Sequence, residues 1–560
     1  MPSLGGDQYK WYCEIPPLAE PGNYPGGVKT KPPFEMGVDD FETNKESTMK
    51  YKKLWTDMHS NIHHDQMEGL DMWYEQIKKT MDFWPIAYYP FYMRPTEFGI
   101  KVEDRYDDET IAKDWEQVRA LAERAKEEGF PMFMGYEWQG AGLDGDHNVF
   151  FLKNDGEQRH PMRYQELVKD YEGQDVIGIP HHLAYQPGSR GKNWDTHNEK
   201  FSPFAEIYSS HGCSENDDGP MAMNRHVHMG PRTGETTYER GLEKGWHVGV
   251  IAAGDNHSVP GVFEHGSMCV LAEDATKEAI WDAFVNRRTY GVSQSRIEVD
   301  YAIGDAVMGG VLETDGEEEL TFHVKGTGAV DRIEIVKDNV LEEMVVHSGT
   351  WERERPEGTI RFKFRLELGW GPDTRVYKDQ WLKEWTGRLE TEGKLLSVEK
   401  CWNNFGQEIV KQDDKSCEFN VTTYQSTATG KWMGPSNVTT EGFIFEIEAD
   451  ADSTVRLFID GKEYPMKVRD MLYTSKVYAL WDEVKELTKK TWGDLEHYRD
   501  DPWWHNAYKI RVNKAYPESS YDLTYQKKMK FEKDCNVRLR IWQKNGDAAW
   551  TSPVFVKVKK

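Results

Sequence analysis

The sequence predicts an α/β barrel followed by an antiparallel β-sandwich, and three observations support this fold class. Over residues 51–293, apolar runs short enough to be buried strands alternate with amphipathic helical segments. Five of these runs end on Asp, Glu or His. From Arg296 onward, apolar and polar residues alternate, which is typical of strands with one solvated face. Parallel barrels carry their chemistry at the C-terminal ends of their strands, so we expect the functional site in the first half.

Composition excludes several classes of function. The chain has 560 residues, of which 38% are hydrophobic and 30% charged, so it has room for about two to four domains. Acidic residues outnumber basic ones 96 to 70, and the net charge of −26 would repel nucleic acids and anionic membranes. No apolar run approaches the roughly 20 residues that span a bilayer. We therefore expect a soluble multidomain protein with no nucleic-acid or membrane partner, of unknown oligomeric state.

The N-terminal sequence and the cysteines indicate the compartment. Met1-Pro-Ser-Leu-Gly-Gly-Asp7 has neither the basic region nor the apolar core of a secretory signal. The sequence as given therefore predicts a cytoplasmic protein, or an exported or periplasmic one if a signal has been removed. The six cysteines are scattered and form no C-x-x-C pair, so we expect reduced thiols.

The elements follow in order along the chain. Residues 1–50 are rich in Pro and Gly and predict an extended segment packed on the barrel. The segment 109–128 has apolar residues on one face at helical spacing and stops before Gly129, and the strand that follows ends on Glu137. Further strands are predicted at 54–59, 81–87, 131–137, 176–181, 204–211 and 248–257, and further helices at 69–80, 236–244 and 277–288.

The second half, residues 294–560, is predicted to form one β-sandwich. Strict alternation marks strands at 320–324, 332–335, 362–368 and 537–541, and Asn545-Gly546 is a hairpin-turn signal. A helical segment with Leu480, Val484 and Leu487 on one face interrupts the pattern. We expect it to be an insertion near 478–510.

The residues at the strand ends are typical ligands of a divalent metal ion. Imidazoles and carboxylates that converge on one point hold such an ion and leave a position for water. A single His after an apolar run is more often structural, but five strand ends with the same property favour a shared site. The predicted metal ligands are His59, Glu137, His181, His211, Asp255 and His257.

These residues also resemble a known family. Asp57-Met-His59, Met81-Asp-Phe83, Gly135-Tyr-Glu137, Pro180-His-His182 and Gly254-Asp-Asn-His257 are similar to motifs of the PHP (polymerase and histidinol phosphatase) superfamily. The resemblance implies a distorted (β/α)7 TIM-like barrel that binds Mn, Zn or Fe. Gly145-Asp-His-Asn148, Arg190-Gly-Lys192, His211–Glu215 and Ala549–Pro553 are similar to a largely uncharacterised subgroup with a β-rich C-terminal domain, domain of unknown function 3604.

The chain departs from the family pattern at two positions. Asn61 stands where the pattern has a second His, and Tyr89 stands where the second strand normally ends on His. The resemblance implies one complete metal position and two weakened ones, so we expect one or two ions (Mn, Zn or Fe). The three implied positions are Glu137 with His181 and His211; His59 with Asn61, Glu137 and Asp255; and His257 with Tyr89 and Glu68 or one of its neighbours, with His63, His64 and Asp65 also available.

Other residues near the strand ends have two open interpretations. Tyr88 and Tyr89 could be a general acid or base, or aromatic packing over the barrel mouth. Arg190 could bind an anion or belong to a solvated loop, and His147 could orient a metal ligand or bond within its own loop. We assign these four residues to catalysis. Substrate binding is assigned to Asn61, His182 and Lys192.

Three functions fit this pattern. The favoured one is a metal-dependent hydrolase that acts on an anionic substrate, a phosphate ester or related ester, by metal-activated water. The second is a metal-assisted polysaccharide lyase, or another carbohydrate-active enzyme, on uronate-containing glycans. The third is a catalytically silent glycan-binding protein. The substrate or partner is thus an anionic small molecule or oligosaccharide. Phosphate release, absorbance of a new double bond, or glycan binding without turnover would distinguish the three.

Overall fold

The strands that carry the predicted site residues run in the same direction. The computed structural model describes residues 51–223, 229–373, 377–425, 438–496, 499 and 501–559, so the predicted N-terminal segment lies outside the described residues. β2 (Ser60–His63), β3 (Trp84–Tyr89) and β7 (Gly135–Trp138) pair in parallel, and β10 (Phe204–Ser209) pairs in parallel with β12 (Gly249–Ala252). A parallel bridge between Ser60 and Asn256 joins these two groups of strands.

One strand in this region runs the other way. β8 (His147–Phe151) pairs antiparallel with β7 on one side and with β9 (Val176–Pro180) on the other. β9 is therefore parallel to β7, and it packs against β10. The short strands β6 (Met132–Phe133) and β11 (Gly212–Cys213) and the hairpin of β4 (Phe91–Pro95) with β5 (Lys101–Arg105) complete this part.

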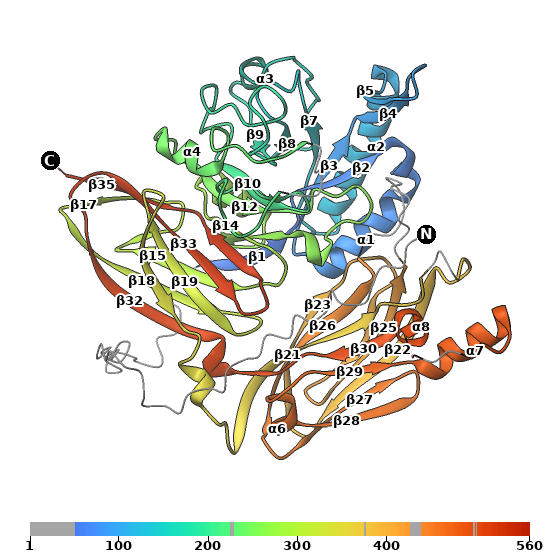
Figure 1. Cartoon of the computed structure of the whole chain (residues 1–560). Helices are drawn as coiled ribbons and strands as arrows, with labels where there is room; N and C mark the ends of the chain where they lie inside the picture. Colours follow the sequence, from blue (N-terminus) through green and yellow to red (C-terminus); the bar gives the residue numbers. More distant parts are fainter. Residues whose placement is uncertain are drawn as a thin grey trace, which may run out of the picture. The chain divides into compact units, whose positions relative to one another are not determined.

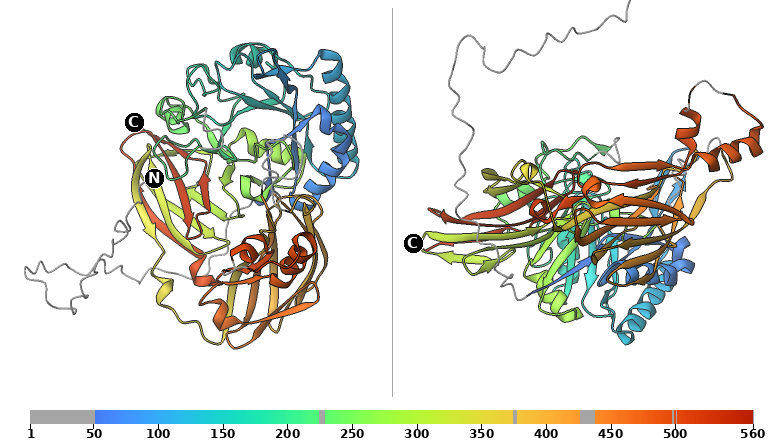
Figure 2. Two further views of the ribbon diagram at one scale, coloured as in Figure 1. Left: turned by 45° about the vertical axis from the view of Figure 1, so that its right-hand side comes forward. Right: turned by 90° about the horizontal axis from the view of Figure 1, so that it is seen from below.

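The helices between these strands match the predicted amphipathic segments. Asp107 caps α2 (Asp108–Glu127) by accepting a hydrogen bond from the backbone N–H of Thr110, and Gly129 (φ 74°) follows its C-terminal end. Its buried face packs on the strands together with α1 (Leu70–Thr80). Figures 1 and 2 show both helices (blue) beside the strands β2 and β3. The other helices here are η1 (His64–Gly69), α3 (Tyr164–Asp170), α4 (Tyr238–Glu243), η3 (Phe263–His265) and α5 (Lys277–Val285).

The closed (β/α)7 barrel of the prediction is not what the structure shows. The predicted first strand is two strands, because β1 (Lys52–Thr56) leaves the parallel strands and pairs antiparallel with β13 (Ser267–Ala272). β13 then pairs with β14 (Thr289–Val292), and β14 pairs with β34 near the C-terminus. Hydrogen bonds between strands thus continue across the predicted boundary at residue 293.

The first β-sandwich packs a nine-stranded sheet against a four-stranded one. Both sheets contribute to one buried cluster, with Ile333 and Ile541 from the large sheet and Phe322 and Leu523 from the small one. In Figure 1, β33 (red) lies beside β19 (yellow-green), far apart in sequence. Besides β1, β13 and β14, the nine-stranded sheet contains β17 (Val311–Thr314), β19 (Val330–Lys337), β20 (Val340–Val346), β33 (Cys535–Gln543), β34 (Ala548–Thr551) and β35 (Val554–Val558); the four-stranded sheet contains β15 (Glu298–Ile303), β16 (Ala306–Val307), β18 (Glu317–Lys325) and β32 (Asp522–Lys530).

A second β-sandwich is inserted between β20 and β32, where the sequence predicts only one. Phe364 and Phe445 of its six-stranded sheet and Trp385 and Phe419 of its five-stranded sheet share a separate core. The predicted helical insertion is present as α7 (Trp481–Trp492) and α8 (Asp501–Asn506). The six-stranded sheet contains β21 (Thr359–Gly369), β23 (Lys394–Cys401), β26 (Thr440–Asp450), β29 (Lys476–Ala479), β30 (Lys509–Val512) and β31 (Tyr516–Pro517); the five-stranded sheet contains β22 (Leu382–Thr391), β24 (Glu408–Gln412), β25 (Ser416–Tyr424), β27 (Thr454–Ile459) and β28 (Lys462–Lys467).

The remaining short helices connect strands of the sandwiches. They are η4 (Trp351–Arg353), α6 (Val468–Met471) and η5 (Glu518–Ser520). Within the described part of the chain, every helix is too short or too polar to cross a bilayer.

Candidate metal centre

His59 lies at the centre of a buried group of carboxylates. Its Nδ1 is 2.7 Å from Glu206 Oε2, while its Nε2 is 3.4 Å from Glu137 Oε2 and 3.4 Å from Asp255 Oδ1. When the Nδ1–H is donated to Glu206, Nε2 faces two carboxylates and the Asn61 amide nitrogen (3.2 Å), and a cation held among these groups would offset the carboxylate charges. Three ligands at about 2.1 Å from a tetrahedral ion lie about 3.4 Å apart. Both 3.4 Å distances from His59 Nε2 match this spacing. His59 belongs to two groups whose ligand atoms lie within 4.8 Å of one another, one with Glu137 and His181 and one with Glu206 and Asp255.

Asp57 holds the loop that carries His59. Its Oδ1 accepts hydrogen bonds from the backbone N–H of His59 (3.0 Å) and of Gly254 (2.7 Å). Its Oδ2 accepts from the Ser60 hydroxyl (2.6 Å) and from the backbone N–H of Gly261 (3.2 Å). Asp57 therefore ties the His59 loop to the loop after β12, and its oxygens are occupied by these donors.

Glu137 and Asp255 each present a second oxygen to another histidine. Glu137 Oε1 is 3.8 Å from His181 Nε2, and Asp255 Oδ2 is 3.0 Å from His211 Nε2. Five of the six predicted metal ligands are thus linked by short contacts through these two carboxylates. Glu137 thus lies between His59 and His181, and Asp255 lies between His59 and His211.

The ring of His211 is held by a side chain that the sequence did not single out. The Tyr185 hydroxyl lies 2.6 Å from His211 Nδ1, and both residues are buried. Histidine ligands of metals usually bond through their other ring nitrogen to a group that fixes the ring, as His59 does with Glu206. Both histidines therefore have the bonding pattern of metal ligands.

Asp146 extends the group on the side of β8. Its carboxylate, His181 and His182 offer ligand atoms within 4.8 Å of one another. The NH1 group of Arg190 donates to Asp146 Oδ2 at 2.6 Å, and His182 Nε2 lies 3.5 Å from the same oxygen. Burial raises the pKa of Asp146 to about 6, although the Arg190 charge opposes this shift. Arg190 also bonds to Glu103, so it pairs with carboxylates at the edge of the site and does not belong to a solvated loop.

The electrostatics of the cluster favour a bound cation. Burial opposes the ionised form of Glu137, but His181 and His59 hold its pKa well below the ordinary value. The pKa of Asp255 is also lowered, against the effect of burial, by His59 and His211. Burial lowers the pKa of His59, yet Asp255 and the other nearby carboxylates raise it well above the ordinary value. The buried carboxylates therefore draw positive charge to this point, which a divalent ion would supply.

Asn61 lies within the cluster. Its Nδ2 is 2.9 Å from Glu137 Oε2 and 3.2 Å from His59 Nε2, and its buried Oδ1 has no hydrogen-bond partner among the described residues. The two ends of an amide have nearly the same shape, so the Oδ1 atom can face the same point after a flip. Asn61 can thus add an oxygen ligand where the family pattern has a His.

Three residues of the site have backbones in the left-handed region. They are His182 (φ 34°), Asp255 (φ 45°) and Arg190 (φ 66°). Residues other than glycine adopt this conformation at a cost of about 1–3 kcal/mol, and such residues cluster at functional sites. The fold therefore holds these side chains at positions that an unstrained loop would not provide.

At the third implied metal position, the structure brings His257 and Tyr89 together with His63. His63 Nε2 is 2.8 Å from His257 Nδ1, and the ring of Tyr89 packs against both histidines with centroid distances of 4.6 and 4.9 Å. Glu68, which the resemblance places here, is an exposed residue of η1. His257 Nε2 is 4.0 Å from Asp255 Oδ1, so this group adjoins the central cluster.

Tyr88 and Tyr89 face opposite sides of β3. The Tyr88 hydroxyl donates to Asp114 of α2 at 2.8 Å within the core, so Tyr88 packs the strand against the helix and does not reach the site. The Tyr89 hydroxyl bonds to Glu103 and receives a hydrogen bond from Gln139 at 3.1 Å. Of the two predicted catalytic tyrosines, only Tyr89 lies beside the cluster, because successive side chains of a strand point in opposite directions.

His147 and Lys192 are paired away from the cluster. His147 Nδ1 donates to the carbonyl of Gly145 (2.9 Å), and its Nε2 accepts from Lys192 Nζ (3.2 Å). Lys192 is only 1% exposed and lies 4.2 Å above the ring of Tyr164, and burial lowers its pKa to about 7. These contacts hold both side chains within the protein, and catalysis by His147 and substrate binding by Lys192 stay predictions.

The sequence assigns no role to Glu206, Asp146 or Tyr185, and it leaves His63 as one of several candidates for the position of His257. Glu206 carried a usable signal, because it is a charged residue in the middle of the apolar strand Phe204-Ala-Glu-Ile207. Asp146 lies in a Gly-rich acidic loop where several acidic residues have similar surroundings in the sequence. No sequence signal separates His63 from its neighbour His64, which bonds to Asp114 instead.

The comparisons with known proteins provide little further information. No family model matches the chain. An uncharacterized protein of Chlamydia pneumoniae is 23% identical over 258 residues, with 41% of each chain covered, and one of Chlamydia trachomatis is 24% identical over 221 residues, with 35% of this chain and 34% of the relative covered. The chain thus spans less than half the length of the curated relatives it matches.

One solved structure shows a distant similarity. It is a two-domain protein from Bacteroides vulgatus described as containing a predicted PHP-like metal-dependent phosphoesterase, with 13% identity and a TM-score of 0.28. The alignment covers 76% of this chain and 99% of that one. A TM-score at this level does not establish a shared fold.

Proposed function

We propose that this protein is a metal-dependent hydrolase that acts on an anionic ester, with phosphate esters as the favoured class. The observation that carries the proposal is the position of His59 Nε2, 3.4 Å from both Glu137 and Asp255, while Glu206 holds the opposite nitrogen. A divalent ion held here by these residues with His181 and His211 would activate water and polarise an ester oxygen. The resemblance of the strand-end motifs to the PHP superfamily supports phosphate esters.

Two residues at the edge of the cluster have suitable chemistry for an anionic substrate. Arg190 keeps its charge and is half-buried beside Asp146, so its remaining N–H groups can bind a phosphoryl oxygen. Burial, together with Glu137 and Glu103, raises the pKa of Tyr89 well above its ordinary value. Tyr89 therefore stays protonated. Its single O–H donates to Glu103, and it would serve the substrate or its leaving group by exchanging that bond.

The other two functions gain no specific support. Among the described residues, no specific contact favours a lyase that uses Tyr89 as its base. A catalytically silent binding protein would also hold an ion among these carboxylates, so turnover is what distinguishes it from the hydrolase. The experiments below therefore test the hydrolase.

Elemental analysis of the purified protein, with and without added Mn, Zn or Fe, tests the proposal together with phosphate release from mono- and diesters. We expect one or two ions per chain and turnover of at least one ester. Glu137→Gln keeps the shape of the side chain and removes its charge, so the variant should lose most of the ion and the activity. Glu446→Gln alters a buried carboxylate of the second sandwich and serves as the control.

Two results would contradict the proposal. One is a folded protein that takes up far less than one ion per chain after incubation with each metal. The other is an ion content that is the same in Glu137→Gln as in the wild type.

A further inference from the structure

Glu103 of β5 occupies two hydrogen-bond donors at the edge of the candidate metal centre. Its Oε2 accepts a hydrogen bond from the NH2 group of Arg190, and its Oε1 accepts one from the Tyr89 hydroxyl. Both oxygens of one carboxylate are therefore held by an arginine and a tyrosine. A phosphoryl group with two free oxygens can use the same pair of donors.

These two donors adjoin the cluster of metal-type ligands. Gln139 Nε2 donates to the Tyr89 hydroxyl (3.1 Å) and to Glu137 Oε1 (3.0 Å), so it links Tyr89 to a predicted metal ligand. On the other side, the NH1 group of Arg190 donates to Asp146 Oδ2 at 2.6 Å. An anion bound in the place of the β5 carboxylate would thus lie beside the cluster.

Of the two carboxylates on Arg190, only that of Glu103 has a short path to solvent. The Asp146 side chain is fully buried, whereas that of Glu103 is 19% exposed. β4 and β5 pair only with each other among the described strands, and residues 97–100 at the turn between them are exposed. The Glu103 side chain can therefore turn to water, where its charge is solvated, while Asp146 stays with Arg190.

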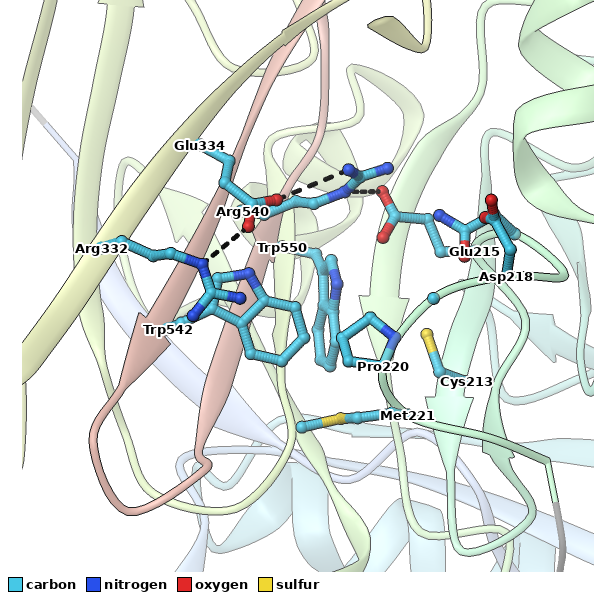
Figure 3. A pocket seen from close by; sticks show the side chains of 12 residues that line it. Cys213, Glu215, Asp218, Pro220, Met221, Arg332, Glu334, Arg540, Trp542 and Trp550 are labelled. Atoms are coloured by element: carbon cyan, nitrogen blue, oxygen red, sulfur yellow. Dashed lines mark hydrogen bonds and ion pairs between the residues drawn. The ribbon is translucent and has the colours of Figure 1, made fainter. Parts of the chain in front are cut away.

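A second group of arginines and carboxylates, shown in Figure 3, differs in this respect. Arg540 lies between Glu215 (2.8 Å) and Glu334 (3.5 Å). Glu215 and Glu334 are only 3% and 9% exposed, and Glu334 belongs to β19, which has a neighbouring strand on each side. These pairs hold a loop against a sheet, and their carboxylates have no comparable path to solvent.

The charges around Arg190 restrict what can replace Glu103. Glu103 and Asp146 share the single positive charge of Arg190. An anionic group that takes the place of the Glu103 carboxylate restores the same pairing, and a divalent ion at the centre would attract it further. A neutral molecule restores no charge pairing. The Glu103 carboxylate is thus a competitor that anions displace more readily than neutral molecules.

Given the proposed function, on which this inference rests, we propose that Glu103 is a specificity-determining residue. In the free protein it fills the anion position at Arg190 and Tyr89, and the phosphoryl group of a substrate displaces it. The displaced side chain turns to solvent, and the Tyr89 O–H then donates to the ester in place of Glu103. Uncharged esters do not compete with the carboxylate and are excluded.

Titration calorimetry of the full chain with inorganic phosphate tests the displacement. Glu103→Gln keeps the shape of the side chain and removes the competing charge, so phosphate binding should become about 3- to 10-fold tighter. Asp104→Asn is the matched control, because it removes the same charge from the next residue of β5, which pairs with Arg94 at 2.8 Å on the surface. It should leave the affinity for phosphate close to that of the wild type. Adding Arg190→Gln to Glu103→Gln should abolish the gain.

Hydrolysis of a phosphate ester gives a second measurement. Since the substrate displaces Glu103 before it reacts, Glu103→Gln should lower KM by a similar factor and change kcat little. Three results would overturn the inference: folded Glu103→Gln binds phosphate no more tightly than the wild type, Asp104→Asn has the same effect, or the gain survives without Arg190.

Ion content separates this inference from the proposed function. If the protein takes up no ion, the proposed function fails, but the phosphate affinity of Glu103→Gln still measures the competition at Arg190. If ions bind and an ester is hydrolysed while Glu103→Gln keeps the phosphate affinity of the wild type, only the role of Glu103 is refuted.

Discussion

At the scale of single residues, the contact of Glu206 with His59 sets the orientation of the His59 ring. It is a charged residue inside a buried strand, and its carboxylate lies 2.7 Å from His59 Nδ1. That contact fixes which nitrogen of His59 faces Glu137 and Asp255. Glu206 thus orients the histidine without having to bind the ion itself.

We predict that Glu206→Gln weakens metal binding about 10- to 100-fold while the protein stays folded. The amide keeps a hydrogen-bonding group next to His59 but removes the negative charge that favours the required tautomer. Competition with a chelator of known affinity measures the change. An affinity equal to that of the wild type would show that Glu206 does not orient His59.

The ion pairs of His323 make the free energy of unfolding depend on pH. Its ring lies between Asp300 (3.7 Å) and Asp522 (2.8 Å), and the bonds to these carboxylates raise its pKa from 6.5 to about 9. The protonated form therefore stabilises the folded protein fully below about pH 6.5, and this contribution is lost as the pH rises through about 9.

Since the ring is partly exposed and solvent screens the pair, we expect a contribution of only about 1 kcal/mol. Urea unfolding of the wild type and of His323→Gln at about pH 6 and about pH 10 measures it. The difference in free energy of unfolding between the wild type and His323→Gln should be smaller at about pH 10 than at about pH 6. A difference that stays constant or grows would refute the assignment.

At the scale of elements, local patterns predicted the helices better than the strands. The segments at 69–80, 109–128 and 277–288 correspond to α1, α2 and α5, because helical spacing of apolar residues and end signals such as Gly129 are local. β8 was missed. Its apolar residues follow directly on a Gly-rich loop, and only its pairing with both β7 and β9 identifies it as a strand.

Gly291 lies where β14 and β12 approach too closely for a side chain. A Cβ atom at this position would lie 2.4 Å from the backbone nitrogen of Ala252, so β14 can cross β12 only with glycine here. Gly291→Ala should destabilise the protein by about 1–3 kcal/mol or more, because a backbone atom cannot rotate away.

Chemical unfolding measures this loss. Gly328→Ala is the matched control, since its nearest atoms would be 4.0 Å from the new Cβ. Equal stability of the two variants would contradict the close approach of β12 and β14.

At the scale of the whole molecule, buried ion pairs connect the first sandwich to the part that carries the candidate metal centre. Arg538 of β33 is 1% exposed and donates to Glu215 Oε1 (3.0 Å) and Glu239 Oε1 (2.7 Å). Glu215 follows His211 by four residues, and Glu239 belongs to α4. These contacts and the pairing of β14 with β34 make the two regions one structure.

Arg538→Met should destabilise the protein by about 3–5 kcal/mol, because it leaves Glu215 buried with one partner fewer. Arg469→Met removes an exposed partner of Asp452 and should change the stability by less than about 1 kcal/mol. Unfolding in urea compares the two variants. A small effect of Arg538→Met would show that the ion pairs do not hold the regions together.

The sequence by itself determined the secondary structure that depends on local periodicity, and it placed metal-type ligands at the ends of strands. Those features follow from neighbours along the chain. The tertiary structure alone decided that β1 and β14 join the sandwich sheet, that two sandwiches form instead of one, and that Tyr89 faces the cluster while Tyr88 faces α2. It also decided that Glu206 faces His59. Most of these outcomes depend on pairings between residues far apart along the chain, such as Glu206 with His59 and β14 with β34. No local pattern encodes which of several similar strands or carboxylates will meet.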